Sequence, residues 1–370
     1  MKVNAVIEEG LLLVRDLLQL GPSSLIGIDI GLHSVKIAEL DKSGEEYTLK
    51  KFAIVPLPEG AMDTGGMIEK RDEVIDSIGR CLANAEIRGG YGAVGLAGPH
   101  TEVKRVQISA GTPAEIDDEI HYDIETHIQF KIDEAAWSYN VVGENQNGSV
   151  EVMLGASRQS HLDEYKSLVE EQGVKVRVVD LTKMALVNTF LHTYADVLEH
   201  AEDESQVLLN IGANRTEMIV VSEGSVIFNK DLAVGGAPIS AEIQRRMGVT
   251  YAAAEDLKIT GDDNGNLPEE VIDIIDEVLK SFFGDIKRDF DHYMKFNAGT
   301  NLREVYITGG SAMLPGLRDG LEELLSVDVK IINPFDRIIY NDNRFTKEEL
   351  NMIAYQGSVA IGLAMRDIYS

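Results

Sequence analysis

Asp29 is the side chain of this sequence that is best placed to do chemistry. It lies near the end of an apolar run from Ile26 to Ile30, and Gly31 follows it before a second apolar alternation starts at Val35. This pattern predicts a β-hairpin whose tight turn carries a carboxylate. Because glycine lets the backbone approach a ligand closely, and turn amides can point at phosphate oxygens, the turn could bind a phosphate group.

A related turn recurs in the second half of the chain. The apolar run 207–211 contains Asn210, Gly212 follows it, and another apolar run starts at Thr216. Ordinary surface hairpins share this pattern, so either turn alone is weak evidence for a ligand site. The repetition roughly half a chain apart predicts two related lobes that close on one polyphosphate.

Two glycine pairs extend the pattern. Gly235 and Gly236 stand just before a predicted helix, where main-chain amides can donate to phosphate. Gly309 and Gly310 follow a predicted strand and precede a predicted helix start, so bare backbone there could lie against a ribose or a base. A tight strand-to-helix turn without a ligand is the alternative interpretation of the second pair.

Glu255 and Lys258 stand three residues apart on one face of a predicted helix. Their carboxylate and ammonium could hold a ribose hydroxyl and flank an adenine. The alternative is an exposed ion pair within the helix, worth roughly a few tenths of a kcal/mol. Taken in isolation, the spacing favours the ion pair.

Composition limits the class of protein. The 370 residues exceed the roughly 250–300 at which one core stops growing, and 44% of them are hydrophobic, so two lobes with real cores are expected. The single cysteine, Cys81, excludes a disulfide framework, fits a reducing compartment and is expected to be a small core residue. A net charge of −28 makes free nucleic acid and anionic lipid poor direct partners. No apolar run approaches the roughly 18 residues of a membrane span, so a cytoplasmic protein is expected.

Hydrophobic periodicity places the expected elements along the chain. Three strands are expected over 25–60, and an α+β segment of the order strand, helix, strand, strand, helix over 101–173. The glycine pattern of 90–95 precedes a strand, whereas a dinucleotide-binding motif follows one, so we exclude a dinucleotide site there. An apolar helix within residues 1–20 is expected either to pack on its own lobe or to bind a partner. The remaining expectations are a helix at 71–85, strands at 93–97 and 176–180, a helix at 181–194, a linker at 199–205, strands at 207–211, 216–221 and 225–231, helices at 239–247, 251–258 and 268–296, a strand at 304–308 and a last helix at 347–368.

Taken in order, the two turns, the connecting helix and the two glycine pairs resemble the actin-like ATPase superfamily. Within it the chain resembles the PilM family of type IV pilus assembly proteins, most closely at 27–31, 34–36, 179–181, 314–317 and 333–335. The resemblance implies an α/β, two-lobed actin-like ATPase fold with an FtsA-type α+β subdomain inserted in the first lobe. The implied boundaries are a helical extension at 1–24, a first lobe at 25–102 and 174–205, the subdomain at 103–173, a second lobe at 206–345 and a C-terminal helix at 346–370 that returns to the first lobe.

The resemblance also implies an ATP site with Mg²⁺. Asp29 matches the position that holds the metal through water, and Asn210 faces it from the second turn. Asp180, at the start of the connecting helix, matches the position that orients the attacking water. The implied nucleotide contacts are Gly31, His33, Ser34 and Lys36 in the first turn, Gly212, Ala213, Asn214 and Thr216 in the second, Gly235 and Gly236 at phosphate or ribose, Glu255 and Lys258 at the nucleoside, and Gly309, Gly310 and Met313 at adenosine.

Two positions depart from the superfamily pattern. Asn210 stands where a carboxylate is usual, and an amide can hydrogen-bond a metal-bound water but brings no charge and is a poor base. We therefore expect slow hydrolysis at most, with ATP acting as a switch rather than as a fuel. His33 stands where small hydroxyl residues are common, and could donate to phosphate or cover the site.

The resemblance implies a nucleotide-gated adaptor that captures the cytoplasmic N-terminal tail of PilN. Through PilN it would join PilO and PilP and, further on, the pilus motors of twitching motility, at the inner membrane but without insertion into it. Self-association stays open. The alternatives are an FtsA-like filament former, for which the ending 366–370 is too short to supply a basic amphipathic helix, a small-molecule kinase, and a GspL-like secretion domain, which would continue into a membrane span.

Overall fold

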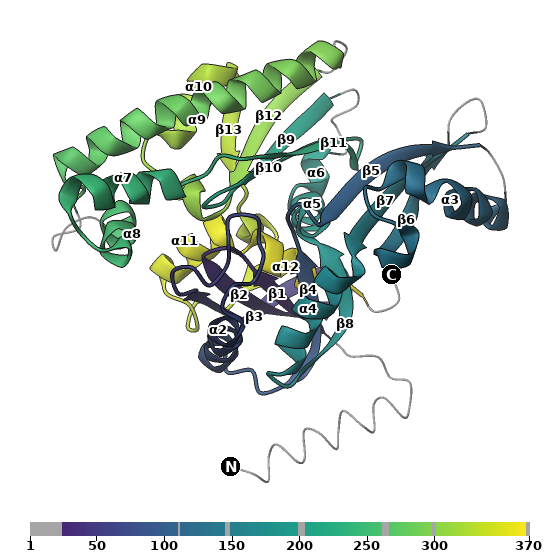
Figure 1. Cartoon of the computed structure of the whole chain (residues 1–370), viewed down its shortest axis with the longest axis horizontal. Helices are drawn as coiled ribbons and strands as arrows, with labels where there is room; N and C mark the ends of the chain where they lie inside the picture. The colour runs from purple at the N-terminus through teal and green to yellow at the C-terminus, as the bar shows by residue number, and fades with distance from the viewer. Residues whose placement is uncertain are drawn as a thin grey trace, which may run out of the picture. The chain divides into compact units, whose positions relative to one another are not determined.

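The computed structural model describes residues 24–109, 112–144, 149–198, 204–260, 266–297 and 301–367, so the predicted helix within 1–20 lies outside the described residues. By their contacts these residues form two units (Figure 1). Unit 1 contains the chain up to 193, residues 334–346 and the chain from 359 onward, and unit 2 contains 194–333 and 347–358. The sequence placed all of 206–345 in one lobe and 346–370 in the other, whereas by contacts the chain changes unit three times after residue 333.

Unit 1 is built on a six-stranded sheet. An antiparallel meander of β1 (Ile26–Ile30), β2 (Ser34–Ser43) and β3 (Glu46–Pro56) forms its first half, as predicted. The strands β4 (Gly90–Leu96) and β8 (Val174–Leu181) then add in parallel beside β1, and the short β14 (Ile339–Tyr340) adds beside β3. The strand order is β14-β3-β2-β1-β4-β8. The glycine pattern of 90–95 lies inside β4, which agrees with its exclusion as a dinucleotide turn.

Alternation along the strands sends side chains to two different helical layers. Ile26, Ile28 and Val94 enter a core shared with α2 (Arg71–Asn84) and α4 (Gln159–Glu170). On the other face, Gly27 lies against the backbone of α12 (Ser358–Ala364), and Gly95 lies against side chains of α12 and of α5 (Thr182–Thr193). Asp29 shares this second face, because it stands two residues after Gly27.

A smaller α+β subdomain follows β4 in the sequence. Its sheet has the order β5-β7-β6, formed by β5 (Thr101–Ile108), β6 (Ala135–Glu144) and β7 (Val150–Arg158). The sequence predicts a helix that begins after Thr112 and Pro113. Helix α3 (Pro113–His127) starts at this point, because Thr112 and Glu115 form a capping box there and Pro113 needs no amide partner. Ile116, Ile120 and Ile124 of α3 pack on this sheet. A short 3₁₀ turn at Ile132–Glu134 leads into β6.

Helix α4 does not belong to the core of this subdomain. The sequence assigned residues 103–173 to the inserted segment, but Tyr165, Leu168 and Val169 of α4 are buried in the core of the six-stranded sheet. The apolar face of a helix can be recognised from its period, whereas the sheet that it covers depends on the path of the chain. The sequence of residues 145–148 predicts a turn between two strands, and these residues lie outside the described ones.

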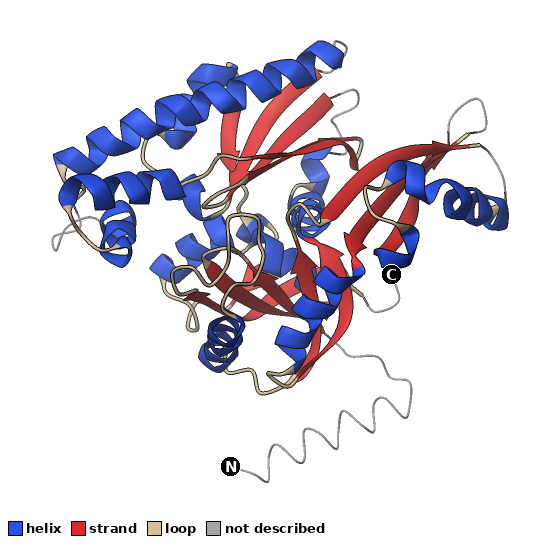
Figure 2. Ribbon diagram, viewed as in Figure 1, coloured by secondary structure: helices blue, strands red, loops and turns tan. Residues whose placement is uncertain are grey.

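Unit 2 repeats the strand order of the first unit. Strands are red and helices blue in Figure 2. A meander of β9 (Glu204–Ile211), β10 (Thr216–Ser222) and β11 (Ser225–Leu232) is joined in parallel by β12 (Asn301–Thr308) and β13 (Asp328–Ile331). The order β11-β10-β9-β12-β13 matches β3-β2-β1-β4-β8 strand for strand. The two related lobes predicted from the repeated turns are therefore present.

Helices cover the apolar face of this second sheet. The long α9 (Glu269–Phe296) buries Val271, Ile275, Phe282 and Ile286 at helical spacing in the same core as Val207 and Ile307. The helices α7 (Ala237–Met247), α8 (Tyr251–Thr260) and α10 (Leu317–Leu325) complete this layer, and α6 (Ala195–Leu198) precedes the sheet. None of the helices in the described ranges combines the length and apolar character needed to cross a membrane.

The predicted last helix at 347–368 is wrong in one respect. The structure has two helices there, α11 (Lys347–Gln356) and α12, which are separated at Gly357. The Gly357 amide donates to the Ile353 carbonyl at 2.7 Å, which completes the last turn of α11. The small residues of α12 allow close packing, since a methyl group on Gly362 would lie 1.8 Å from the Ala185 carbonyl oxygen.

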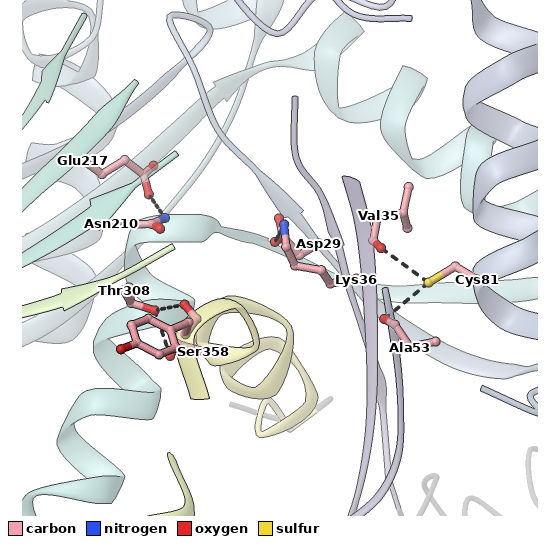
Figure 3. A network of polar contacts seen from close by, with 10 residues as sticks. Asp29, Val35, Lys36, Ala53, Cys81, Asn210, Glu217, Thr308 and Ser358 are labelled. Atoms are coloured by element: carbon pink, nitrogen blue, oxygen red, sulfur yellow. Dashed lines mark hydrogen bonds and ion pairs between the residues drawn. The ribbon is translucent and has the colours of Figure 1, made fainter. Parts of the chain in front are cut away.

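Cys81 is a core residue, as predicted. It is fully buried on α2, and its thiol lies 3.4 Å from the carbonyl oxygens of Val35 and Ala53 (Figure 3). Burial raises the pKa of this thiol to about 12. The thiol is therefore neutral in the folded unit and packs as a small apolar group.

Gly27→Ala tests the close contact between β1 and α12. An added methyl group would lie 1.9 Å from the Ala360 carbonyl oxygen, so backbone must move, and we expect a loss of about 3 kcal/mol in the free energy of unfolding. Urea denaturation measures this. Gly143→Ala is the matched control, because no heavy atom lies within 4 Å of its added methyl and its change should stay within about 0.5 kcal/mol. Equal effects at the two sites would contradict the contact.

Candidate functional site

The first turn, Gly31–Ser34, joins β1 to β2. The Gly31 amide donates to the Ser34 carbonyl at 3.0 Å, and the Leu57 amide donates to the His33 carbonyl at 2.8 Å. These bonds hold a four-residue turn at the carboxyl end of β1. The predicted residues of the first turn therefore lie together in one hairpin.

Asp29 lies directly opposite Lys36 in this hairpin. The Lys36 Nζ atom is 3.3 Å from Asp29 Oδ2, and the two side chains are only 12% and 11% exposed (Figure 3). A buried carboxylate needs a cation nearby, because burial penalises an unpaired charge. Lys36 supplies that cation within unit 1, and a metal at Asp29 would meet an ammonium already in contact with the carboxylate.

Asp180 lies in β8, one residue before its end, and not at the start of the connecting helix as the resemblance implies. Its Oδ1 accepts a hydrogen bond from the Leu181 amide at 2.8 Å, and its Oδ2 lies 3.2 Å from Arg366 Nε. Burial raises the pKa of the Asp180 carboxyl, and the Arg366 charge offsets part of that rise. Arg366, nearly two hundred residues away in the sequence, was not predicted as a partner.

The second turn, Gly212–Arg215, has the same construction as the first. The Gly212 amide donates to the Arg215 carbonyl at 2.9 Å, and Thr216 continues into β10. Asn210 lies directly opposite Glu217, as Asp29 lies opposite Lys36. Asn210 Nδ2 donates to Glu217 Oε2 at 2.9 Å, and Glu217 is only 5% exposed (Figure 3).

Three glycine-containing turns meet within unit 2. The Gly236 amide donates to the Gly212 carbonyl at 3.1 Å, and the Ala237 amide donates to the Ala213 carbonyl at 2.7 Å. From the third turn, the Ser311 hydroxyl donates to the same Gly212 carbonyl at 2.9 Å. Segments predicted to share a site from widely separated places in the sequence are thus joined by their backbones.

The contacts of these turns leave no room for side chains. A methyl group on Gly235 would lie 2.4 Å from the Ala213 carbonyl oxygen, and one on Gly309 would lie 2.5 Å from the Ile211 carbonyl oxygen. Gly309 also has a φ of +100°, which side chains rarely adopt. Glycine is therefore required at both positions, whatever the turns bind.

Glu255 and Lys258 form a buried network rather than an exposed ion pair. Lys258 is 8% exposed, and its Nζ lies 2.7 Å from Glu255 Oε1 and 2.8 Å from the Ser240 hydroxyl, which also bonds Glu255. Ser240 lies near the start of α7, the helix that follows the first glycine pair, Gly235 and Gly236. The network links α8 to the helix that starts at Gly235 and Gly236, a link the sequence did not reveal.

Gly310 and Met313 lie in a single 3₁₀ turn, not at the start of an α-helix, because α10 starts only at Leu317. The prediction of a helix start at this glycine pair is therefore wrong. The Gly309 amide instead donates to the Tyr355 carbonyl at 2.7 Å, and Gln356 Nε2 lies 3.7 Å from the Met313 sulfur. Both partners belong to α11.

The predicted residues thus fall into two groups, one in each unit. Unit 1 holds the first turn with Asp29, Lys36 and Asp180, and unit 2 holds the second turn, both glycine pairs and the Lys258 network. Among the residues that the structure describes, no set of three acidic, histidine or cysteine side chains forms a metal cage. A metal here would depend on one carboxylate together with water and phosphate oxygens, which is the usual way of binding Mg²⁺.

Residues 27–368 match the family model described as "Type IV pilus assembly protein PilM". The fold is similar to that of a solved PilM-PilN type IV pilus biogenesis complex, with a TM-score of 0.79 and 24% identity over 93% of this chain and 99% of that chain. It is also similar to the ethanolamine utilization protein EutJ from Carboxydothermus hydrogenoformans, with a TM-score of 0.52 and 14% identity over 92% and 90% of the two chains. The cell division protein FtsA of Enterococcus hirae is 22% identical over 358 residues, 84% of this chain and 78% of the relative. These likenesses establish the two-lobed actin-like fold.

Arg366→Met tests the charge contact at Asp180. A carboxyl whose pKa is raised in the folded state stabilises the fold at low pH and loses that contribution as pH rises through the folded pKa. Removal of Arg366 raises the pKa further, so we expect a loss of about 3 kcal/mol at pH 7.5 and a smaller loss at pH 4.5. Urea denaturation at the two pH values measures this.

The double variant Asp180→Asn with Arg366→Met is the control for this experiment. It removes both charges, so most of the stability lost at pH 7.5 should return. A loss of the same size at both pH values, or no recovery in the double variant, would show that Arg366 stabilises the unit through packing alone.

Proposed function

Because this chain belongs to the PilM family of type IV pilus assembly proteins, we propose that it is an ATP-binding adaptor that captures the cytoplasmic N-terminal tail of PilN. The nucleotide part of the proposal depends on one observation, the junction of three glycine turns in unit 2 by two main-chain hydrogen bonds and one from the Ser311 hydroxyl. The partner part is supported by the similar solved structure, which is a complex of PilM with PilN.

The residues present fit a nucleotide with Mg²⁺. Gly235 and Gly309 keep bare backbone at the junction, and an added Cβ at either would meet neighbouring carbonyl oxygens. In the proposal, Gly212, Ala213, Asn214, Thr216, Gly235 and Gly236 bind phosphate or ribose, Glu255 and Lys258 the nucleoside, and Gly309, Gly310 and Met313 the adenosine. Gly31, His33, Ser34 and Lys36 take phosphate, and Asp29 holds the metal through water.

In this proposal the nucleotide acts as a conformational switch. Mg²⁺ supplies charge neutralisation for the polyphosphate, and the chain supplies few groups that could speed its cleavage. Asn210 is an amide, and its Nδ2 already donates a hydrogen bond to Glu217. Asp180 is proposed to orient the attacking water, but its carboxylate already contacts Arg366, which competes with that water for the negative charge. Slow hydrolysis follows, with binding rather than turnover setting the affinity for the partner.

The proposed location is the cytoplasmic side of the inner membrane, reached through PilN. The net charge of −28 opposes direct attachment to anionic lipid. In the described ranges there is no helix suited to span a bilayer, so the proposal assigns membrane attachment to the partner. PilO and PilP would be reached through PilN, and the motor ATPases and self-association are further extensions of the same proposal.

An FtsA-like filament former is the second candidate, and the sequence match to FtsA favours it over a kinase. The inserted three-stranded subdomain with α3 fits either candidate. The two candidates differ in how they reach the membrane, because the filament former would bind lipid itself.

Asp29→Ala tests the nucleotide site. We expect Mg²⁺-dependent ATP binding to fall by on the order of a hundredfold, because the carboxylate that holds the hydrated metal is lost. Isothermal titration calorimetry with Mg-ATP measures this. Asp41→Ala is the control, since Asp41 lies on β2 but its side chain is 57% exposed and pairs only with Lys50 among the contacts described. Unchanged binding by Asp29→Ala would refute the assignment of Asp29.

A synthetic peptide with the apolar N-terminal tail of PilN tests the partner. We expect saturable binding whose affinity changes when Mg-ATP is added, measured by fluorescence anisotropy, and no sedimentation with anionic vesicles. A scrambled peptide of the same composition is the control. Sedimentation with vesicles in the absence of peptide, with no peptide binding, would favour the FtsA-like alternative instead.

A further inference from the structure

Glu217 is a buried carboxylate to which neither the sequence nor the family resemblance assigns a role. It is 5% exposed and lies on β10, one residue after the second turn. Its neighbour in the sequence, Thr216, donates its hydroxyl to the Val234 carbonyl at 2.9 Å, one residue before the glycine pair of α7. Glu217, the second residue of β10, therefore lies beside the junction of the glycine turns.

The two hairpins can be superposed position by position from their registers. Asp29 corresponds to Asn210, and Lys36 corresponds to Glu217, because each pair is directly opposed across its hairpin and spans a turn of the same hydrogen-bonding pattern. In unit 1 the acid stands on the first strand, and in unit 2 it stands on the second. The second hairpin thus has one carboxylate in its second cross-strand pair from the turn, as the first hairpin has, but on the opposite strand.

The side chains of Asn210 and Glu217 are in direct contact. Glu217 Oε2 accepts a hydrogen bond from Asn210 Nδ2 at 2.9 Å, so a full negative charge lies one hydrogen-bond length from the amide at position 210. Because Nδ2 is used in this bond, Asn210 presents its Oδ1 elsewhere, toward Gly309, where an added Cβ would lie 2.7 Å from that oxygen. The amide is therefore held in one orientation and in turn holds the carboxylate.

A row across three strands shows how this charge is placed. Asn210 is paired with Glu217 on one side and with Thr308 on the other. The Thr308 hydroxyl donates to the Tyr355 carbonyl at 2.8 Å and lies 3.2 Å from the Ser358 hydroxyl (Figure 3). Glu217 is the acidic member of this row at the carboxyl end of β9, where the second turn begins.

We propose that Glu217 is the metal-facing carboxylate of unit 2, oriented by Asn210 to accept hydrogen bonds from water on a nucleotide-bound divalent cation. This inference rests on the proposed function and deepens it. Divalent magnesium keeps most of its water and binds few protein oxygens, so a carboxylate one residue beyond a phosphate turn is suited to its outer shell. The second hairpin therefore still carries one carboxylate, on β10 at position 217 instead of on β9 at position 210.

The test exploits the near-identical shapes of Glu and Gln. In Glu217→Gln the Asn210 amide can still donate to a side-chain oxygen, but the charge is lost. We expect Mg-ATP affinity, measured by calorimetry, to fall on the order of tenfold, with ATP affinity in EDTA unchanged. Asn210→Asp combined with Glu217→Gln restores an acid and amide pair with the charge returned to 210, and should recover affinity to within about threefold of the parent.

Glu304→Gln is the matched control. Glu304 is a second buried carboxylate on the same face of this sheet, 7% exposed, but it lies at the other end of β12, paired with Lys330 and Tyr306. Its substitution should leave both affinities unchanged. If all buried carboxylates on this face act only on stability, Glu304→Gln and Glu217→Gln will change the thermal midpoint and leave Mg-ATP affinity as it is.

The outcomes distinguish a failure of the proposed function from a failure of this inference alone. A parent protein without Mg²⁺-dependent ATP binding overturns the proposed function and this inference with it. A parent that binds Mg-ATP together with a folded Glu217→Gln variant of equal affinity overturns the inference alone. If Glu217→Gln fails to fold, the double variant decides, because a folded double variant that has lost Mg²⁺ dependence overturns the inference and one that retains it supports it.

Discussion

Each unit depends on one hydrogen bond within its hairpin turn, from the amide of a glycine to the carbonyl three residues later. In unit 1 it joins Gly31 to Ser34, and in unit 2 it joins Gly212 to Arg215. A turn closed in this way fixes the register of the hairpin, and a slip of one residue would send every side chain of the strand to the other face. The core, the helices that cover it and the opposed polar pairs at the hairpin ends all follow from that register.

The two hairpins then differ in the charge that they present. The first ends in an acid opposed by a lysine, and the second in an amide opposed by an acid. In unit 2 the surrounding polar groups are mostly main-chain atoms already bonded to one another, which limits their movement. Backbone that is already fixed loses little freedom when a ligand arrives, so such a junction favours affinity. A site that relies on fixed backbone and one carboxylate suits retention of a ligand more than its chemical conversion.

The local structure could be predicted well from the sequence, because strand alternation, helical period and turn residues act over a few neighbours. The meanders, the capped start of α3 at Thr112 and the burial of Cys81 followed from such signals. Long-range choices could not be predicted. The sheet covered by α4, the contact of Asp180 with Arg366 and the separation of α11 from α12 depend on segments that meet only after folding. Glu217 was within reach, since its spacing of seven from Asn210 repeats that of Lys36 from Asp29.

The buried thiol of Cys81 gives the molecule a built-in reporter. It is the sole cysteine of the sequence, and in the folded state it is covered by α2 and two strands and kept neutral by burial. A thiol-reactive dye can modify it only when that covering separates, and the reaction needs the thiolate, which is scarce until the pKa falls toward its ordinary value. The labelling rate therefore measures how often unit 1 opens, independently of what happens in unit 2, without any engineered substitution.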